Sequence, residues 1–174
     1  MEEAFADWFQ RWDGIRLGYS ESSIVDGDNL ICTPDGYGSA GYSSIIIGGI
    51  TGRKQYVQLT GRGVVGVDSE HGDLLWIYNR IANDVANTPT PIVKGDYIFY
   101  SPGYGTGAAL IQIHDRNGKY EVEEKYFLKG NELQNHHGGM LLVTTNSLQL
   151  TDTDVDTLND AQTINSLDFN HRCY

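Results

Sequence analysis

One segment of this chain occurs twice, and this repetition constrains the fold more than any other feature of the sequence. Residues 23–31 read SIVDGDNLI, and residues 91–99, 68 positions later, read PIVKGDYIF. A Gly-Tyr-Gly triplet follows each copy, at 36–38 and at 103–105. Repeat proteins bury their core between neighbouring units, so we expect a series of similar units, with function on a face or channel of the array.

Two further apolar segments fit the same template less closely, and their spacing indicates the size of the unit. Their centres are Ile46 and Leu141, so the interval is 46 residues from Ile46 to Ile92 and 49 from Ile92 to Leu141. A four-stranded propeller blade takes roughly 40–50 residues. The interval from Ile24 to Ile46 is only 22 residues, which indicates that half of the first unit is missing.

The composition favours an all-β chain. Of the 174 residues, 21 are glycine, 11 are tyrosine and four are proline, a balance that suits many short strands joined by tight turns. The formal net charge of −11 argues against nucleic acid or an anionic membrane as the main partner. No apolar run approaches the ~18 residues of a membrane span. The acidic N-terminus also lacks the basic-then-apolar layout of a secretory signal, so we expect no export signal in this chain.

Helical periodicity is confined to residues 1–18. Phe5, Trp8, Phe9 and Trp12 recur there at three- and four-residue spacing. The pattern predicts a short amphipathic cap that packs on the first strands, and a partner-binding helix is the alternative.

The rest of the chain divides into strands and a tail. Residues 19–150 read as strands, and Cys32, within an apolar strand, is expected to be a small core residue. Asn117-Gly118 is the strongest short hairpin signal in the chain. Residues 151–174 form a divergent acidic tail, and we expect its sparsely apolar start, residues 151–160, to be frayed or adaptive.

A second hairpin is predicted around an aspartate, a glycine and a tryptophan. A valine-rich strand leads into Asp68, a polar turn follows, and Trp76 lies in the next apolar run. Asp68 can accept hydrogen bonds from the amides of the turn, and Gly72 can take the positive φ that the turn requires. Trp76 is expected to fill the space between adjacent sheets.

The spacing of Asp68, Gly72 and Trp76 resembles the blade signature of quinoprotein-like (PQQ-like) β-propeller repeats. In that signature a small apolar residue precedes Asp, and three positions separate Asp from Gly and Gly from Trp. Segments at 18–22, 55–61, 90–93, 103–109 and 135–140 are similar to PQQ-like repeat proteins of the bacterial cell envelope. The resemblance covers roughly residues 15–143. It implies a partial β-propeller of about three to four four-stranded antiparallel blades, in a protein of the periplasm or cell envelope.

The chain also departs from that family. Family members usually carry seven or eight blades and a signal peptide, and about three blades cannot close a ring whose usual range is roughly 4 to 8. The chain therefore resembles a fragment or a shortened relative, in which missing blades or further copies complete the ring.

The resemblance leaves three hypotheses for function. The first is a non-catalytic module for binding or scaffolding, with no cofactor. The alternative is part of a PQQ-dependent alcohol dehydrogenase that binds PQQ and calcium, but the chain has no adjacent cysteine pair and no matching calcium-ligand motif. The third is a homo-oligomer of short chains that together form the ring.

The candidate ligand surface consists of Tyr104, Asn135 and His136. Under the binding hypothesis it takes a protein or small-molecule ligand on the loops at one end of the blades. Adjacent histidines on a strand point to opposite faces, so His136 and His137 are not expected to share a metal ion. The favoured interpretation is instead a loop or pore-facing histidine that hydrogen-bonds to the backbone. The glycine-rich run at 103–107 is expected to connect two strands, because a strand-like segment follows it.

Overall fold

The computed structural model describes residues 23–32, 42–144, 147–150 and 163–164. Within them the chain is all-β, as the composition predicts, with thirteen strands and no helix. The strands form one two-stranded, two four-stranded and one three-stranded antiparallel sheet. The predicted helical cap at 1–18 lies outside the described residues. No helix in the described part of the chain is long and apolar enough to cross a membrane.

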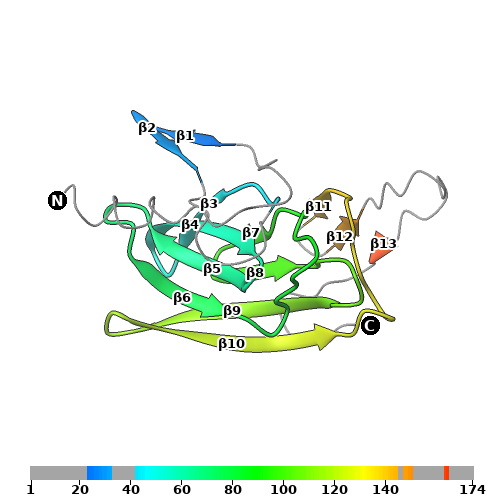
Figure 1. The fold of residues 1–174 in the computed structure, drawn as a ribbon. Coiled ribbons are helices and arrows are strands. Elements are labelled where there is room, and N and C mark those ends of the chain that lie inside the picture. The colour runs from blue at the N-terminus through cyan, green and yellow to red at the C-terminus, as the bar shows by residue number, and fades with distance from the viewer. Residues whose placement is uncertain (1–22, 33–41, 145–146, 151–162, 165–174) are drawn as a thin grey trace.

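The sheets follow one another along the chain (Figure 1). The first contains β1 (Ile24–Asp26) and β2 (Asn29–Ile31). The second contains β3 (Ile46–Ile50), β4 (Arg53–Thr60), β5 (Gly63–Asp68) and β6 (Leu74–Tyr78). The third contains β7 (Ile92–Lys94), β8 (Tyr97–Tyr100), β9 (Ala108–Arg116) and β10 (Lys119–Leu128). The fourth contains β11 (Met140–Thr144), β12 (Ser147–Leu150) and β13 (Thr163–Ile164).

The repeated segment folds into the same hairpin twice. In β1–β2, Ile24 pairs with Ile31 and Asp26 with Asn29, and in β7–β8 the equivalent positions pair in the same register. Both turns place a glycine at positive φ, with +61° at Gly27 and +56° at Gly95. A side chain is strained in that conformation, so the two glycines are part of what the repeat encodes.

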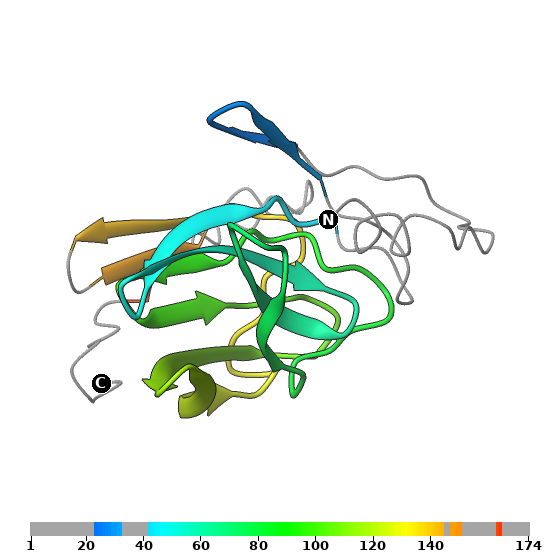
Figure 2. The ribbon, with the colours of Figure 1, turned by 90° about the vertical axis from the view of Figure 1, so that its left-hand side faces the viewer.

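The second, third and fourth sheets meet through their first strands. β3 contacts β7, and β7 contacts β11, while the last strands β6 and β10 also contact each other (Figure 2). The approach is close at Gly48 of β3, where an added Cβ would lie 2.8 Å from Cγ1 of Val93 in β7. A larger residue at position 48 would therefore force the Val93 side chain or one of the two strands to shift.

Two hydrophobic clusters lie on the two faces of the third sheet. The larger cluster joins the second and third sheets and includes Val57, Trp76, Ile98 and Ile111. The smaller cluster is centred on Phe99, and residues of β11 pack against it. The core is therefore a series of sheet-to-sheet contacts, as the repeat predicts.

The turn after β5 has the predicted hairpin geometry. The Asp68 carboxylate accepts a hydrogen bond from the amide of His71 at 3.2 Å, and the amide of Gly72 donates to the Asp68 carbonyl at 3.0 Å. Gly72 has a φ of +75°. Arg53 also binds Asp68 through two hydrogen bonds of 2.9 Å, which ties the turn to β4.

Trp76 packs in the larger core cluster, and a glycine makes room for it. An added Cβ on Gly66, its partner across the strands, would lie 2.0 Å from the Trp76 ring. The indole Nε1 donates a 2.7 Å hydrogen bond to Oε1 of the buried Gln55. The polar edge of the tryptophan is thereby satisfied within the core.

Two sequence expectations need revision. The prediction of three to four four-stranded sheets is correct for two, and no closed ring forms among the described residues. Cys32 is exposed, because the third strand that buries the equivalent Tyr100 has no counterpart beside β2 in the described chain. Of the predicted tail at 151–174, the structure describes only β13, which pairs with β12; the rest, including the part expected to be frayed or adaptive, lies outside the described residues.

Candidate functional site

A cavity of about 380 Å³ lies where three consecutive sheets meet through their first strands. Its volume is within the range of about 300–1,000 Å³ that is typical of small-molecule sites. β3, β7 and β11 each supply apolar side chains, and the loops before β7 and β11 complete the wall. The lining residues are Ile46, Thr88, Pro89, Thr90, Pro91, Ile92, Val93, His137, Gly138, Gly139, Met140 and Leu142.

The cavity is mainly apolar, with a few polar groups. Thr88 and Thr90 carry hydroxyl groups, and His137 carries an imidazole that can donate and accept hydrogen bonds. Such a wall suits a ligand with an apolar body and a single polar group. The arrangement follows from the fold, because each lining strand begins a separate sheet and the loop before it lies at the same end.

Two residues of the predicted ligand surface come together beside this cavity. The rings of Tyr104 and His136 lie edge to face, with centroids 4.8 Å apart. The His137 ring is 6.5 Å from that of Tyr104 and 6.3 Å from that of His136. The three rings form an aromatic cluster, and His137 is the member that also lines the cavity. Both histidines lie in a loop, so the alternation of a strand does not separate them.

Asn135, the third predicted residue, is fully buried and holds the loop. Its Nδ2 donates to the carbonyl of Gly138, and its Oδ1 accepts from the amide of the same residue, both at 2.9 Å. These two bonds close the loop that carries His136 and His137. Asn135 therefore positions the histidines and does not itself form the surface.

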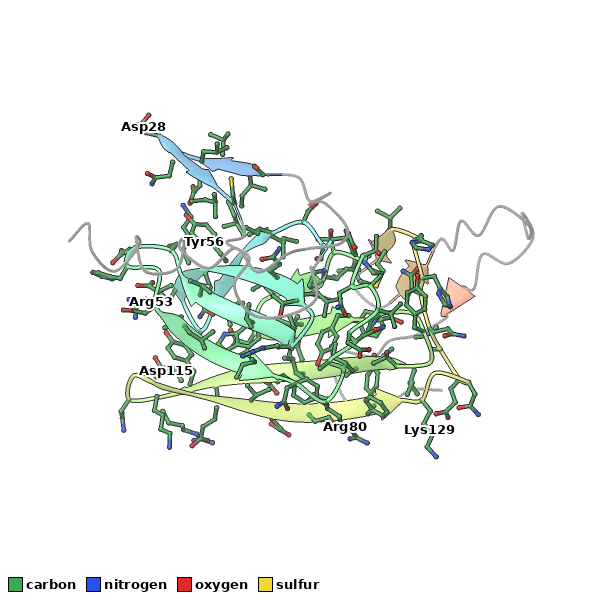
Figure 3. All side chains as sticks on the ribbon, viewed as in Figure 1. Asp28, Arg53, Tyr56, Arg80, Asp115 and Lys129 are labelled. Atoms are coloured by element: carbon green, nitrogen blue, oxygen red, sulfur yellow. The ribbon has the colours of Figure 1, made fainter. Side chains whose placement is uncertain are left out.

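The glycine-rich connection from β8 to β9 makes room for the histidine loop. An added Cβ on Gly103 would lie 2.7 Å from Nδ1 of His136, and one on Gly130 would lie 2.3 Å from the backbone of Gly105. The amide of Gly105 donates a 2.9 Å hydrogen bond to Oε1 of Gln134. In Figure 3, Lys129, which directly follows β10, marks the end of the third sheet at which these loops lie, and Asp115 of β9 marks the opposite end. The predicted strand connection is thus correct, and its glycines permit close contact between the loops.

Tyr104 has an uncommon backbone conformation. Its φ is +60°, and its side chain is 43% exposed. The left-handed region is strained for a bulky residue, and such strain concentrates at functional sites. The carbonyl of the preceding Gly103 accepts a 3.0 Å hydrogen bond from Nδ2 of Asn83.

The predicted structural motif of Asp68, Gly72 and Trp76 lies outside this cavity wall. Asp68 is buried, which tends to raise its pKa, but hydrogen bonds from His71 and Arg53 outweigh this effect and hold the pKa below its usual value. Asp68 therefore stays ionised and accepts hydrogen bonds. Its role is to stabilise the turn.

The sequence did not identify His137 or residues 88–91 as parts of a site. Their signal was present in the proline-rich TPTP run before β7 and in the second histidine of the pair. Among the described residues, no three His, Cys, Asp or Glu side chains are grouped closely enough to hold a metal ion. The chain matches no protein-family model, and comparisons with curated proteins and with solved structures found no match either.

Proposed function

We propose that this chain is a non-catalytic binding module of the PQQ-like β-propeller type, which takes a small ligand in the cavity between the first strands of its sheets. The observation that carries the proposal is that cavity, of about 380 Å³ and lined from three consecutive sheets. The two four-stranded antiparallel sheets, adjacent through β3 and β7, agree with the resemblance in the sequence. That resemblance extends the proposal to binding or scaffolding in the bacterial cell envelope.

The walls define the chemistry of the ligand. Ile46, Ile92 and Met140 offer apolar contacts, and the His137 imidazole offers a hydrogen bond at one side. A compact, planar apolar molecule with one anionic or hydrogen-bond-accepting group satisfies both. The Tyr104 and His136 rings lie beside the cavity and extend the surface available to a larger ligand.

A dye of this chemistry tests the cavity directly. 1-Anilinonaphthalene-8-sulfonate has an apolar body and one anionic group, and its fluorescence rises in apolar surroundings. We expect saturable binding to the folded chain, and loss of that binding in Thr90→Trp, which fills the cavity from a half-buried position. Thr88→Trp is a second variant of the same kind. If both variants fold and bind the dye as the wild type does, the cavity is not the site.

The polar contact is tested at the histidine. His137→Ala is expected to weaken dye binding by about 3- to 10-fold, which corresponds to the loss of one hydrogen bond. His114→Ala is the matched control, because His114 lies in β9 and pairs with Glu123 outside the cavity. Equal effects of the two substitutions contradict a specific role for His137.

The quinoprotein alternative is tested with its own cofactor. We expect the midpoint of thermal unfolding, followed by circular dichroism, to be unchanged by PQQ with calcium. A ligand that binds only the folded state raises the stability, by about 2.7 kcal/mol at 100-fold excess over its dissociation constant. A clear upward shift with PQQ and calcium would favour the oxidoreductase alternative and justify an assay of alcohol oxidation.

A further inference from the structure

Tyr104 lies in a turn whose two central residues both have positive φ. The amide of Thr106 donates to the carbonyl of Gly103 at 3.3 Å, which closes the turn. The φ angle is +60° at Tyr104 and +76° at Gly105. Positive φ at both central positions is the requirement of a type I′ turn, for which asparagine and glycine are the favoured residues. Gly105 meets this requirement without cost, whereas a bulky tyrosine is strained there.

Strain of this kind persists only where the surrounding structure holds the backbone in place. Two side chains from other loops bind this turn. Nδ2 of Asn83, in the loop between β6 and β7, donates a 3.0 Å hydrogen bond to the Gly103 carbonyl. Oε1 of Gln134, in the loop between β10 and β11, accepts a 2.9 Å hydrogen bond from the Gly105 amide. The residues before and after Tyr104 are therefore each held by a different loop.

Asn83 also connects this turn with the wall of the cavity. It is buried, and its Oδ1 accepts a 2.8 Å hydrogen bond from the amide of Val85. Its backbone carbonyl accepts a 2.6 Å hydrogen bond from Nδ2 of Asn87. Asn87 directly precedes Thr88, which lines the cavity. One buried residue thus contacts both the loop before β7 and the turn that carries Tyr104.

We propose that Asn83 and Gln134 are positioning residues, which hold the strained turn and thereby keep the Tyr104 ring against His136, beside the cavity. The inference rests on the proposed function in one part only, namely that the ring contacts the ligand. The Tyr104 side chain is 43% exposed and offers an aromatic contact to a ligand that extends out of the cavity. The ligand class is then an elongated aromatic molecule, with one ring system in the cavity and a second against Tyr104.

The first test requires no ligand, so it is independent of the proposed function. Because the ring centroids of Tyr104 and His136 are 4.8 Å apart, we expect cross-relaxation between the two rings in NMR spectra of the wild type. Asn83→Asp replaces the donating amide by a carboxylate, and Gln134→Met removes the accepting oxygen. Each is expected to abolish the ring contact and to speed hydrogen exchange of the Thr106 amide by about 2- to 10-fold, which corresponds to the loss of one hydrogen bond.

Two controls separate these hydrogen bonds from effects of charge and misfolding. Gln134→Glu keeps an accepting oxygen, and Asn117→Asp adds a charge in the exposed turn between β9 and β10, so both are expected to retain the ring contact. Circular dichroism establishes that each variant is folded, and if Asn83→Asp does not fold, Gln134→Met decides. A ring contact that persists in either folded test variant, or that is lost equally in Gln134→Glu, overturns the proposal.

The part played by strain is tested with a second substitution in the turn. Asparagine tolerates positive φ, and Asn-Gly is a preferred pair for a type I′ turn. In a Tyr104→Asn background, Gln134→Met is therefore expected to leave exchange of the Thr106 amide nearly unchanged, because the turn then forms without support from another loop. An acceleration as large as in the wild-type background means that Gln134 acts independently of the strain at Tyr104, and overturns the proposal.

Dye binding tests the contact between Tyr104 and the ligand. The dimeric form of 1-anilinonaphthalene-8-sulfonate joins two dye units, so that one can occupy the cavity while the other meets the Tyr104 ring. We expect Gln134→Met to weaken binding of the dimeric dye by about 3- to 10-fold and of the single dye by less than about 2-fold. Equal weakening of both dyes overturns the assigned contact with Tyr104. Failure of both dyes to bind the wild type contradicts the proposed function, whereas the ring contact still decides the positioning role.

Discussion

The two copies of the repeated hairpin have the same backbone and different surroundings. β1–β2 and β7–β8 share their register and a glycine at positive φ in the turn. Yet Leu30 is 66% exposed, whereas the equivalent Ile98 is completely buried. Figures 1 and 2 both show the first hairpin projecting from the other strands. Local sequence therefore determines the hairpin, and the strands that follow determine whether it becomes core.

The turns of the two hairpins differ in the same way. The Asp96 carboxylate accepts a hydrogen bond from the amide of Thr51, which joins the β7–β8 turn to the β3–β4 turn. The equivalent Asp28 lies at the outer tip of the first hairpin (Figure 3). The first hairpin is attached instead through Asp26, which accepts hydrogen bonds from Lys54 and Tyr56 of β4. A polar contact there replaces the apolar packing of the second copy.

Truncation of equivalent side chains gives the largest expected difference between the copies. Ile98→Ala is expected to lower the free energy of unfolding by about 2–5 kcal/mol, because it leaves a cavity in the core. Leu30→Ala is expected to lower it by less than about 0.5 kcal/mol, because the side chain is already in solvent. Urea denaturation followed by circular dichroism measures both. Similar losses would mean that the first hairpin is also part of the core.

The sequence predicts local features of this fold well. The hairpins around Asp68 and at Asn117-Gly118 were both expected, because a turn depends on a few neighbouring residues and on a residue that takes positive φ. The exposure of Cys32 was not expected. An apolar strand is buried only if another strand or sheet covers it, and that partner lies far away in the chain.

The candidate site was predicted in part, for a similar physical reason. Tyr104 and His136 were expected to form a surface, and the structure brings their rings together. Asn135 is fully buried, because its two hydrogen bonds close the loop. The cavity itself was not foreseen, since it is formed by strands that begin 46 and 48 residues apart, at Ile46, Ile92 and Met140. No short sequence pattern encodes a contact between strands that lie so far apart in the chain.

Substitution of the turn glycine is expected to have a similar local cost in the two hairpins. Gly27 and Gly95 both have positive φ, and an added Cβ would meet nothing within 4 Å at either position. Alanine should therefore cost about 1–2 kcal/mol locally in each turn, from backbone strain alone. We expect Gly95→Ala to lower the global free energy of unfolding, and Gly27→Ala to act only on the opening of its own hairpin.

Hydrogen exchange distinguishes these two outcomes. Gly27→Ala is expected to speed amide exchange within β1–β2 and to leave exchange in β3–β10 unchanged. Gly95→Ala is expected to speed exchange in the most protected amides of the third sheet. If Gly27→Ala also lowers the global stability by the full amount, the first hairpin unfolds together with the rest of the described chain.

Loss of the hydrogen bonds that attach the first hairpin through Asp26 is expected to have the smallest effect, and this effect depends on pH. Hydrogen bonds from Lys54 and Tyr56 hold the pKa of Asp26 below its ordinary value of 3.8. Burial and the nearby Asp26 raise the pKa of Tyr56 to about 12, so its phenol remains a donor at neutral pH. Because the pKa of Asp26 is lowered in the attached state, its contribution is present above about pH 4 and is lost as the pH falls through the lowered pKa.

NMR signals of the Tyr56 ring measure this attachment. In the wild type, they are expected to shift as the pH falls below about 4, when Asp26 takes up a proton. Asp26→Asn is expected to abolish that transition and to change the Tyr56 signals already at neutral pH. Asp28→Asn removes a charge from the same turn and is the matched control, which should retain the transition. A transition that persists in Asp26→Asn would show that an acid other than Asp26 causes it, and the contrast between a polar attachment in the first copy and apolar packing in the second would then lose this support.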